Sequence, residues 1–311
     1  MNAFLETGSG VVLQVGILFV LILAGGVATK CKWIDRHGVD VMINILLYLV
    51  TPCLIIDAFL AVEFSFQTAV QLAVAAGCAA LTHLAGIVFS YLFWSEKDAR
   101  KKAVYRFGVI FSNGGFMAMP MAQALFGEQG VFYGSAYVIV FNIMQWTYGI
   151  SLMDFKRGKA SFRKILINPG TIGVLIGIPL FFFRLPVPEI LSEPIGYLAT
   201  LNTPLAMLIT GFFLVTADFK SGLFDRKMWV SFLLRLLIIP GFMLLLFRFG
   251  FGISGVLLAC CILPACAPCA VNTMILSAKF GGDTALASRM IALSTLLSVL
   301  TMPVLLALSQ I

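Results

Sequence analysis

The sequence has few charged residues for its length. Of its 311 residues, 11% are charged and 60% are hydrophobic, and the mean hydropathy is +1.02. A soluble domain of average composition has about 25% charged residues. The chain therefore lacks the polar surface that a water-soluble core requires, and its composition indicates an integral membrane protein.

Residues that commonly serve catalysis or metal binding are also scarce. The chain has two histidines, His37 and His83, and no Gly-x-Ser-x-Gly motif. Gly281-Gly282-Asp283 does not have the spacing of an intramembrane aspartyl protease. The cysteine number is odd, and Cys266-x-x-Cys269 is explained by close helix packing. We therefore expect no enzyme, no cofactor, no metal site and no disulfide framework.

Long apolar runs occupy most of the chain. Most reach the approximately 20 residues that a helix needs to cross a bilayer, and the period-two alternation of a membrane barrel is absent. The longest hydrophilic stretch, 154–164, is too short for a soluble domain, so a single membrane domain over 1–311 is expected. The ten apolar segments are roughly 11–29, 41–60, 69–93, 104–126, 131–153, 165–183, 195–216, 228–247, 254–278 and 285–308.

Basic residues fall on alternate connections between these segments. Eighteen of the 21 Lys and Arg residues lie in the odd-numbered connections, while Arg184 and Arg248 lie in even-numbered ones and Arg235 lies within a segment. Positive loops stay cytoplasmic. This pattern predicts a multi-pass protein of the plasma (inner) membrane with both termini extracytoplasmic. Anionic lipids are a sufficient partner for the net charge of +7, and nucleic acid is not expected.

The two halves of the chain resemble each other. Thr51-Pro52 recurs 152 residues later as Thr203-Pro204, and Ala124–Gly127 (Ala-Leu-Phe-Gly) recurs 154 residues later as Ala278–Gly281 (Ala-Lys-Phe-Gly). Each half holds five apolar segments, an odd number, so two halves of one fold must lie in opposite orientations in the membrane. We predict an all-α protein of ten transmembrane helices, built as two inverted five-helix repeats of about 1–155 and 160–311.

The fourth and ninth spans are poorly suited to continuous helices. The fourth contains Ser-Asn-Gly-Gly-Phe-Met-Ala-Met-Pro over 112–120, and the ninth contains Pro264 and Pro268. At an offset of 154 residues, Gly114 falls on Pro268, so the breaks occupy equivalent places. If the broken helices cross near the bilayer midplane, two half-helix N-termini meet there and favour an anion. The alternative is a pair of proline kinks packed by neighbouring helices.

The candidate substrate-binding residues surround these breaks. Asn113 is the strongest candidate because an amide offers both donors and an acceptor; its alternative role is to cap the broken helix. Asn142 and Gln145 share a helix face in the fifth span, and either line a cavity or form an interhelical seam. The predicted substrate-binding set is Ser112, Asn113, Gly114, Gly115, Pro268, Cys269, Asn272 and Thr273.

Three ionisable residues in the spans are candidates for coupling or gating. Asp57 either carries a coupling ion or reaches the outer interface, which we favour. His83 either titrates during transport or is a hydrogen-bonded structural residue. Arg235 either pairs with a substrate carboxylate or snorkels toward the cytoplasmic face, which is favoured because it costs less free energy.

The break in the fourth span also resembles a family motif. Residues 112–120 resemble the Asn-x-Gly-Phe-Met-Gly-x-Pro crossover helix of the auxin efflux carrier family, with Ala118 in place of the usual glycine. Asn168–Thr171 with Leu175-Ile176-Gly177, and Asn202–Met207, resemble its sixth and seventh spans. The resemblance implies a fold like that of the sodium/bile-acid symporters, with scaffold and crossover subdomains and alternating access. It implies small organic anions as substrates, auxins in plants and malonate or malate in bacteria, and homodimers occur in such proteins.

Together these features predict a secondary transporter of a small organic anion, namely a carboxylate such as malate, malonate or an auxin-like acid. The alternatives are an anion channel and a membrane sensor that transports nothing. Coupling to protons, to sodium or to neither is left open by the sequence.

Overall fold

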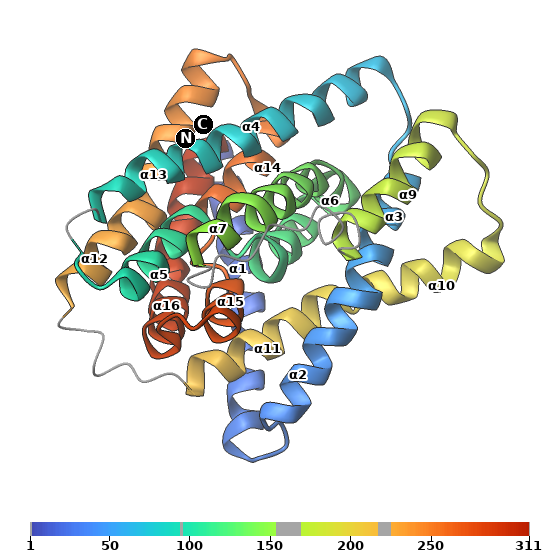
Figure 1. Cartoon of the computed structure of the whole chain (residues 1–311). Coiled ribbons are helices and arrows are strands. Elements are labelled where there is room, and N and C mark those ends of the chain that lie inside the picture. Colours follow the sequence, from blue (N-terminus) through green and yellow to red (C-terminus); the bar gives the residue numbers. More distant parts are fainter. Residues whose placement is uncertain (1, 94–95, 154–168, 217–224, 311) are drawn as a thin grey trace.

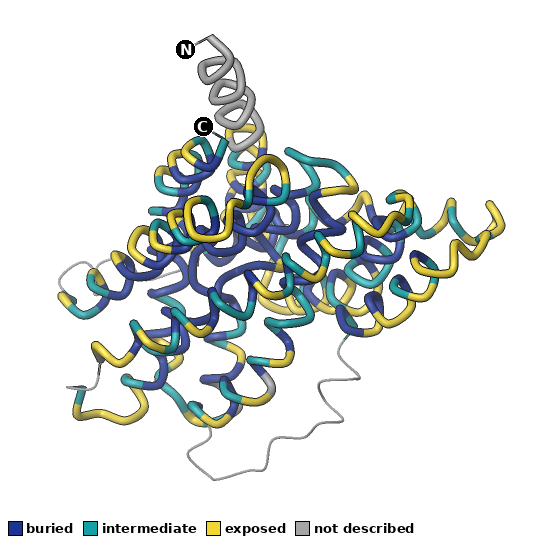
Figure 2. The backbone as a smooth tube through the Cα atoms, turned by 90° about the horizontal axis from the view of Figure 1, so that it is seen from above, coloured by how far each residue is buried: buried dark blue, intermediate teal, exposed yellow. Residues whose placement is uncertain are grey.

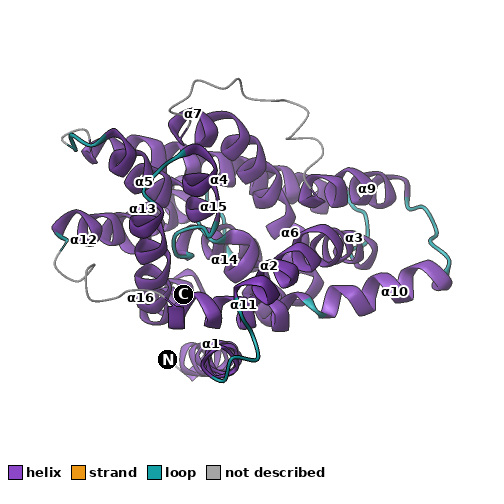
Figure 3. Cartoon of the chain, turned by 60° about the horizontal axis from the view of Figure 1, so that its bottom comes forward, coloured by secondary structure: helices purple, strands orange, loops and turns teal. Residues whose placement is uncertain are grey.

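The computed structural model describes residues 2–93, 96–153, 169–216 and 225–310, with side chains from residue 16 onward except those of Phe93, Trp146, Ala278 and Lys279 (Figure 1). Helices make up nearly all of this part of the chain (Figure 3). The sole β pairing within the described ranges is an isolated bridge between Ser112 and Cys269. The predicted all-α class is confirmed for these residues.

The first half contains helices, 3-10 turns and π-helical turns, the last two marked η. They are α1 (Asn2–Lys30), α2 (Arg36–Ile45), η1 (Leu46–Val50), α3 (Thr51–Ala61), α4 (Phe66–Ser90), η2 (Tyr91–Phe93), α5 (Ala99–Ile110), η3 (Gly114–Ala118), α6 (Met119–Met144), η4 (Gln145–Gly149) and α7 (Ile150–Met153). The second half contains α9 (Pro169–Phe183), α10 (Glu189–Thr200), α11 (Asn202–Thr216), α12 (Arg226–Leu233), η5 (Leu234–Ile238), α13 (Ile239–Leu245), η6 (Leu246–Gly250), α14 (Gly255–Cys266), α15 (Asn272–Phe280) and α16 (Thr284–Gln310).

Prolines set where several helices change their winding. Pro52, Pro120 and Pro240 each lie in the first turn of an α-helix that follows a π-helical turn. Proline has no N–H to donate and crowds the carbonyl four residues earlier, so the turn before it widens. The fourth and fifth predicted segments meet at Gly127, whose φ of 57° lies in the region that glycine tolerates.

The helices have the length and surface of membrane spans. Within the described residues, six helical stretches are long and apolar enough to cross a bilayer: Arg36–Ala61, Phe66–Ser90, Gly114–Met153, Glu189–Thr216, Arg226–Gly250 and Thr284–Gln310. Gly16–Lys30, Pro169–Phe183 and Gly255–Cys266 are shorter apolar helices. Large apolar side chains face outward, with Phe66 at 82%, Ile190 at 83% and Phe249 at 76% exposure. Such side chains are suited to contact with lipid, whereas the buried residues concentrate in the middle of the molecule (Figure 2).

We distinguish two groups of helices, and α1 and α11 contact members of both. The scaffold group comprises α1, α2, α3, α9, α10 and α11, of which α2, α3, α9 and α10 lie together at the right of Figure 1. The crossover group comprises α4 to α7 and α12 to α16. Helices α1 and α11 approach closely because they meet at glycines: a Cβ atom on Gly211 would lie 2.1 Å from the Ile22 carbonyl oxygen. The two groups meet where α3 and α9 contact α6, and where α1 and α11 contact α6 and α16.

Candidate functional site

Two interrupted helices cross and pair in the crossover group. Helix α5 ends at Ile110 and helical winding resumes at Gly114, while α14 ends at Cys266 and α15 begins at Asn272. The intervening segments run antiparallel, with Ser112 opposite Cys269. Asn113 N donates to Pro268 O at 2.7 Å, and Ala270 N donates to Phe111 O at 3.0 Å. The unwound backbone is therefore satisfied by pairing one break with the other, as buried irregular backbone at membrane depth requires.

The structure corrects the predicted alignment of the breaks. The helix bounds place the breaks 156 to 158 residues apart: α5 ends at Ile110 and α14 at Cys266, and helical winding resumes at Gly114 and at Asn272. The predicted offset of 154, which placed Gly114 on Pro268, is therefore wrong at the crossing. The reason is unequal lengths: Gly114 to Gly127 is longer than the corresponding stretch from Asn272 to Gly281, so the offset falls to 154 after the break.

Arg235 holds the carbonyl ends of both interrupted helices. Its side chain is fully buried at 0% exposure. Nε donates to Ala267 O at 3.1 Å, and the Nη2 group donates to the carbonyl oxygens of Pro264 and Ala265 at the end of α14. The Nη1 group donates to the carbonyl oxygens of Val109 (3.2 Å) and Ile110 (3.4 Å) at the end of α5. The expectation that Arg235 snorkels to the cytoplasmic face is wrong, because five backbone acceptors in the interior compensate its desolvation.

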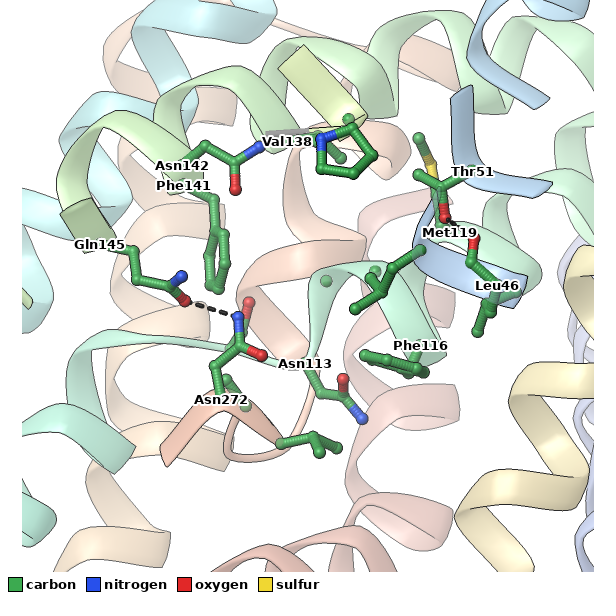
Figure 4. Close-up of a pocket in the computed structure, with 18 of the residues that line it drawn as sticks. Leu46, Thr51, Asn113, Phe116, Met119, Val138, Phe141, Asn142, Gln145 and Asn272 are labelled. Atoms are coloured by element: carbon green, nitrogen blue, oxygen red, sulfur yellow. Dashed lines mark hydrogen bonds between the residues drawn. The ribbon is translucent and has the colours of Figure 1, made fainter. Parts of the chain in front are cut away.

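A cavity of about 260 Å³ lies beside the crossing, between the two helix groups (Figure 4). The scaffold group contributes Leu46, Leu47, Tyr48, Thr51, Pro169, Gly170 and Asn202 to its wall. The crossover group contributes Ser112, Asn113, Gly114, Gly115, Phe116, Met119, Tyr137, Val138, Phe141, Asn142, Gln145, Ala270, Val271, Asn272, Ile275 and Leu276. Among the described residues of this wall none is acidic or basic, and amides are its most polar groups.

Hydrogen bonds join several of these polar groups across the cavity. Asn272 Nδ2 donates to Gln145 Oε1 at 2.6 Å, linking α15 to η4 (Figure 4). Asn142 Nδ2 lies 3.4 Å from Thr171 Oγ1, a contact between α6 and α9. Asn142 and Gln145 therefore serve both as lining residues and as partners in interhelical hydrogen bonds, so the two predicted roles coexist.

Asn113 lies at the start of the resumed helix, and its side chain has no hydrogen-bond partner among the described residues. It is 3% exposed and makes no side-chain capping bond, so the alternative of a cap for its own helix is wrong. Its backbone carbonyl accepts from Met117 N and Ala118 N. In Figure 4 it lies between Asn272 and Phe116. The amide therefore remains available to a ligand.

The glycines after Asn113 differ in their surroundings. A Cβ atom on Gly115 would meet nothing within 4 Å, so this backbone faces open space. A Cβ atom on Gly114 would lie 2.9 Å from the Tyr137 ring, whose hydroxyl is 2.6 Å from Ser112 Oγ. Because the first N–H groups of a helix have no intrahelical partner, the start of this helix presents donors to the cavity.

Asn202 is a lining residue that the sequence indicates only as part of a family motif. It lies at the junction of α10 and α11, is 1% exposed, and its Nδ2 has no hydrogen-bond partner within the described chain. Its position directly before Thr203-Pro204, one of the repeated pairs, was the available signal.

Other predicted site residues lie off the cavity wall. Cys269 is buried, with its N–H donating to Ser294 Oγ at 3.1 Å, and the carbonyl of Pro268 is occupied by Asn113. Thr273 is buried, and its Oγ1 has no partner in the part of the chain that the structure covers. Their predicted contact with substrate stays a prediction.

The candidate coupling residues also lie outside this wall. Asp57 is half-buried near the end of α3. His83 is fully buried, with Nδ1 2.8 Å from Ala79 O and its ring 5.6 Å from that of Phe111. Roles for these residues and for Arg235 in coupling or gating stay predictions. Across the residues described, no cluster of three His, Cys, Asp or Glu side chains has the geometry of a metal site.

The fold and the cavity define a class of protein: a multi-pass helical membrane protein in which two helix groups enclose a ligand-sized cavity at a helix crossing. The sequence matches the family described as "Membrane transport protein" over residues 11–161 and 155–306. The chain belongs to this family, which is that of the auxin efflux carriers. It is also similar to an "Uncharacterized transporter" of Methanothermobacter thermautotrophicus, with 23% identity over 291 residues that cover 92% of this chain and 94% of the relative.

Proposed function

We propose that the protein is a secondary transporter that moves a small organic carboxylate across the plasma membrane by alternating access. The observation that carries this proposal is the cavity between the scaffold and crossover groups, with the free amide of Asn113 at its wall. A site between two bodies is exposed to one side and then to the other when one body moves against its neighbour. Ligand sites in such carriers lie where discontinuous helices meet.

The chemistry of the crossing favours an anion. The two half-helix N-termini, at Gly114 and Asn272, face the cavity and have partial positive charge. The opposing C-termini are neutralised by Arg235. A carboxylate at the crossing would accept from the amide of Asn113 and from the backbone N–H groups of Gly114 and Gly115.

The rest of the wall favours a monocarboxylate with an apolar body. Leu46, Phe116, Val138, Phe141 and Ile275 provide apolar surface for that body. A second carboxylate, as in malate or malonate, would be buried without a cationic partner among the described lining residues, which is costly. An auxin-like acid therefore fits this wall better than a dicarboxylate does.

The topology we propose has ten spans as two inverted repeats, with both termini extracytoplasmic. In this orientation the cavity extends from the middle of the span Arg36–Ala61, where Leu46 to Thr51 lie, toward the cytoplasmic side, because Pro169 follows the basic connection at 156–164 and Leu276 precedes Lys279. The structure would then represent an inward-facing state. Lipid is the expected surrounding partner, and a homodimer is compatible with the exposed apolar helices.

Counterflow in proteoliposomes tests this function. Vesicles are loaded with unlabelled phenylacetate, indole-3-acetate or malate, and entry of the same labelled acid at trace concentration is measured. A carrier gives faster, transient accumulation of label, with the two monocarboxylates more effective than malate. Entry that is unaffected by the loaded acid would indicate the channel alternative, and absence of all flux would favour the sensor.

Two matched variants connect the flux to the cavity. Gly115→Leu adds a side chain where the backbone faces open space, so the protein should fold and lose counterflow. Gly77→Leu makes the same change on the exposed face of α4, where a Cβ atom also meets nothing within 4 Å, and should retain it. Full counterflow in the folded Gly115→Leu variant would contradict transport through this cavity.

A further inference from the structure

All the N–H donors of the Arg235 guanidinium are used in hydrogen bonds to main-chain carbonyl oxygens. A guanidinium has five N–H donors, and the five carbonyl oxygens that accept from Arg235 belong to Val109, Ile110, Pro264, Ala265 and Ala267. In the part of the chain that the structure describes, Arg235 forms no ion pair with a carboxylate, whereas Arg36 pairs with Asp40 and Lys227 with Glu96.

The charge of the guanidinium matches that of the helix ends it contacts. A helix C-terminus has a partial charge of about −0.5, so the two ends that meet at Arg235 amount to about −1. One guanidinium of charge +1 offsets both. At zero exposure there is little water to screen these charges, so the match is strong.

The same carbonyl arrangement without the arginine would form a site for a free cation. Unwound backbone carbonyls and half-helix C-termini are the groups that coordinate sodium in carriers with broken helices. The arginine occupies this position permanently, because it is attached to η5.

We propose that Arg235 is a tethered cation that takes the place of a bound sodium ion at the crossing, so that the transport cycle requires no sodium. The inference rests on the proposed transport function. Arg235 is a positioning residue: it fixes the C-termini of α5 and α14 together, and thereby leaves the N-termini at Gly114 and Asn272 for the substrate. When the crossover group moves, the guanidinium of Arg235 that offsets the partial charges of the α5 and α14 C-termini moves with it.

Thermal unfolding of the purified full-length chain tests the stability part of this proposal without any substrate. The melting temperature is compared in sodium chloride, choline chloride and choline chloride with millimolar methylguanidinium, at equal ionic strength. The wild type should show the same value in all three. Arg235→Ala should melt several degrees lower in choline, and methylguanidinium or sodium should restore at least half of the loss. Arg248→Ala, on the same span, serves as control and should show no cation response.

Arg235→Lys keeps the charge but has fewer donors in a less suitable geometry. It should be intermediate in stability, and it provides a folded variant if Arg235→Ala does not fold. A wild-type stability in Arg235→Ala would overturn the proposal. Loss of stability in Arg235→Ala that no added cation reduces would also overturn it, because a purely packing role predicts no rescue. So would an Arg235→Lys variant that is no more stable than the uncharged Arg235→Met.

Uptake separates this proposal from the transport function itself. Wild-type proteoliposomes should take up phenylacetate at equal rates in sodium and in choline. Uptake that requires sodium would overturn the tethered-cation proposal and leave carboxylate transport standing. Absence of uptake in both salts would contradict the transport function, while the thermal data would still decide the role of Arg235.

Discussion

Removing the amide of Asn113 should weaken substrate binding without unfolding the protein. The residue is 3% exposed and its side chain makes no capping bond, so Asn113→Ala leaves no partner unsatisfied among the described residues. A hydrogen bond to a charged group contributes about 1.5–3 kcal/mol. At about 1.4 kcal/mol for each factor of ten, the dissociation constant for a carboxylate should rise by about 10- to 150-fold.

The stability of this variant should change little. A loss of 1 kcal/mol lowers the melting temperature by about 2–4 °C in chains of 150–250 residues, and we expect a shift below about 2 °C for Asn113→Ala. Asn113→Asp has nearly the same size but places a carboxylate beside the substrate, so its binding should fall below detection.

Titration calorimetry with phenylacetate on detergent-purified protein measures these affinities, and differential scanning fluorimetry checks the fold. Asn44→Ala, an exposed asparagine on α2, is the control and should bind as the wild type does. Wild-type affinity in both Asn113 variants would refute the assignment of Asn113 to the site. A large loss of stability would refute the view that its side chain is free.

Two further predictions concern helix packing and the ion pair between Lys227 and Glu96. Gly211→Leu should destabilise the protein by more than about 1–3 kcal/mol, the usual cost of overpacking. The reason is that the Cβ atom alone would lie 2.1 Å from the Ile22 carbonyl oxygen. A melting temperature equal to that of Gly77→Leu would contradict the close approach of α1 and α11. The ammonium group of Lys227, 2.5 Å from Glu96, lowers the pKa of that carboxyl below its usual 4.5 through a hydrogen bond. A lowered folded-state pKa means that the pair contributes stability above pH 4.5 and loses it as the pH falls through the folded-state value. Lys227→Met should therefore lower stability at pH 7 by under about 1 kcal/mol and flatten the pH dependence in that window, whereas an unchanged pH profile of unfolding would contradict the coupling.

The interrupted helices could be predicted from sequence because proline, glycine and asparagine weaken a helix locally. The run from Ser112 to Pro120 and the pair Pro264 and Pro268 have this effect within their own segments. The register of the crossing could not be predicted in the same way. It depends on the unequal lengths of the resumed helices, which motifs such as Ala124–Gly127 do not reveal at the break itself.

The role of Arg235 could not be predicted because its partners are distant in the sequence. The acceptors lie 125–126 residues before it and 29–32 residues after it. Backbone carbonyls have no residue-type signature, so only the crossing reveals them. A preference for snorkelling is reasonable for an isolated helix, and it fails here because two helix ends supply acceptors inside the protein.

The hydrogen bond between Gln145 and Asn272 illustrates the same limit. Each side chain was a candidate from its own segment, but their pairing across 127 residues follows from how the fifth and ninth spans pack. Asn202 belongs to a family motif, but its position on the cavity wall depends on the junction between α10 and α11.

A structure determined with a bound monocarboxylate tests the central claim most directly. The account predicts ligand density in the cavity between the scaffold and crossover groups. The carboxylate should lie about 2.7–3.2 Å from the amide nitrogen of Asn113 and from a backbone nitrogen of Gly114 or Gly115, as hydrogen bonds require. A saturating ligand bound elsewhere, or one whose carboxylate points away from the crossing, would contradict it.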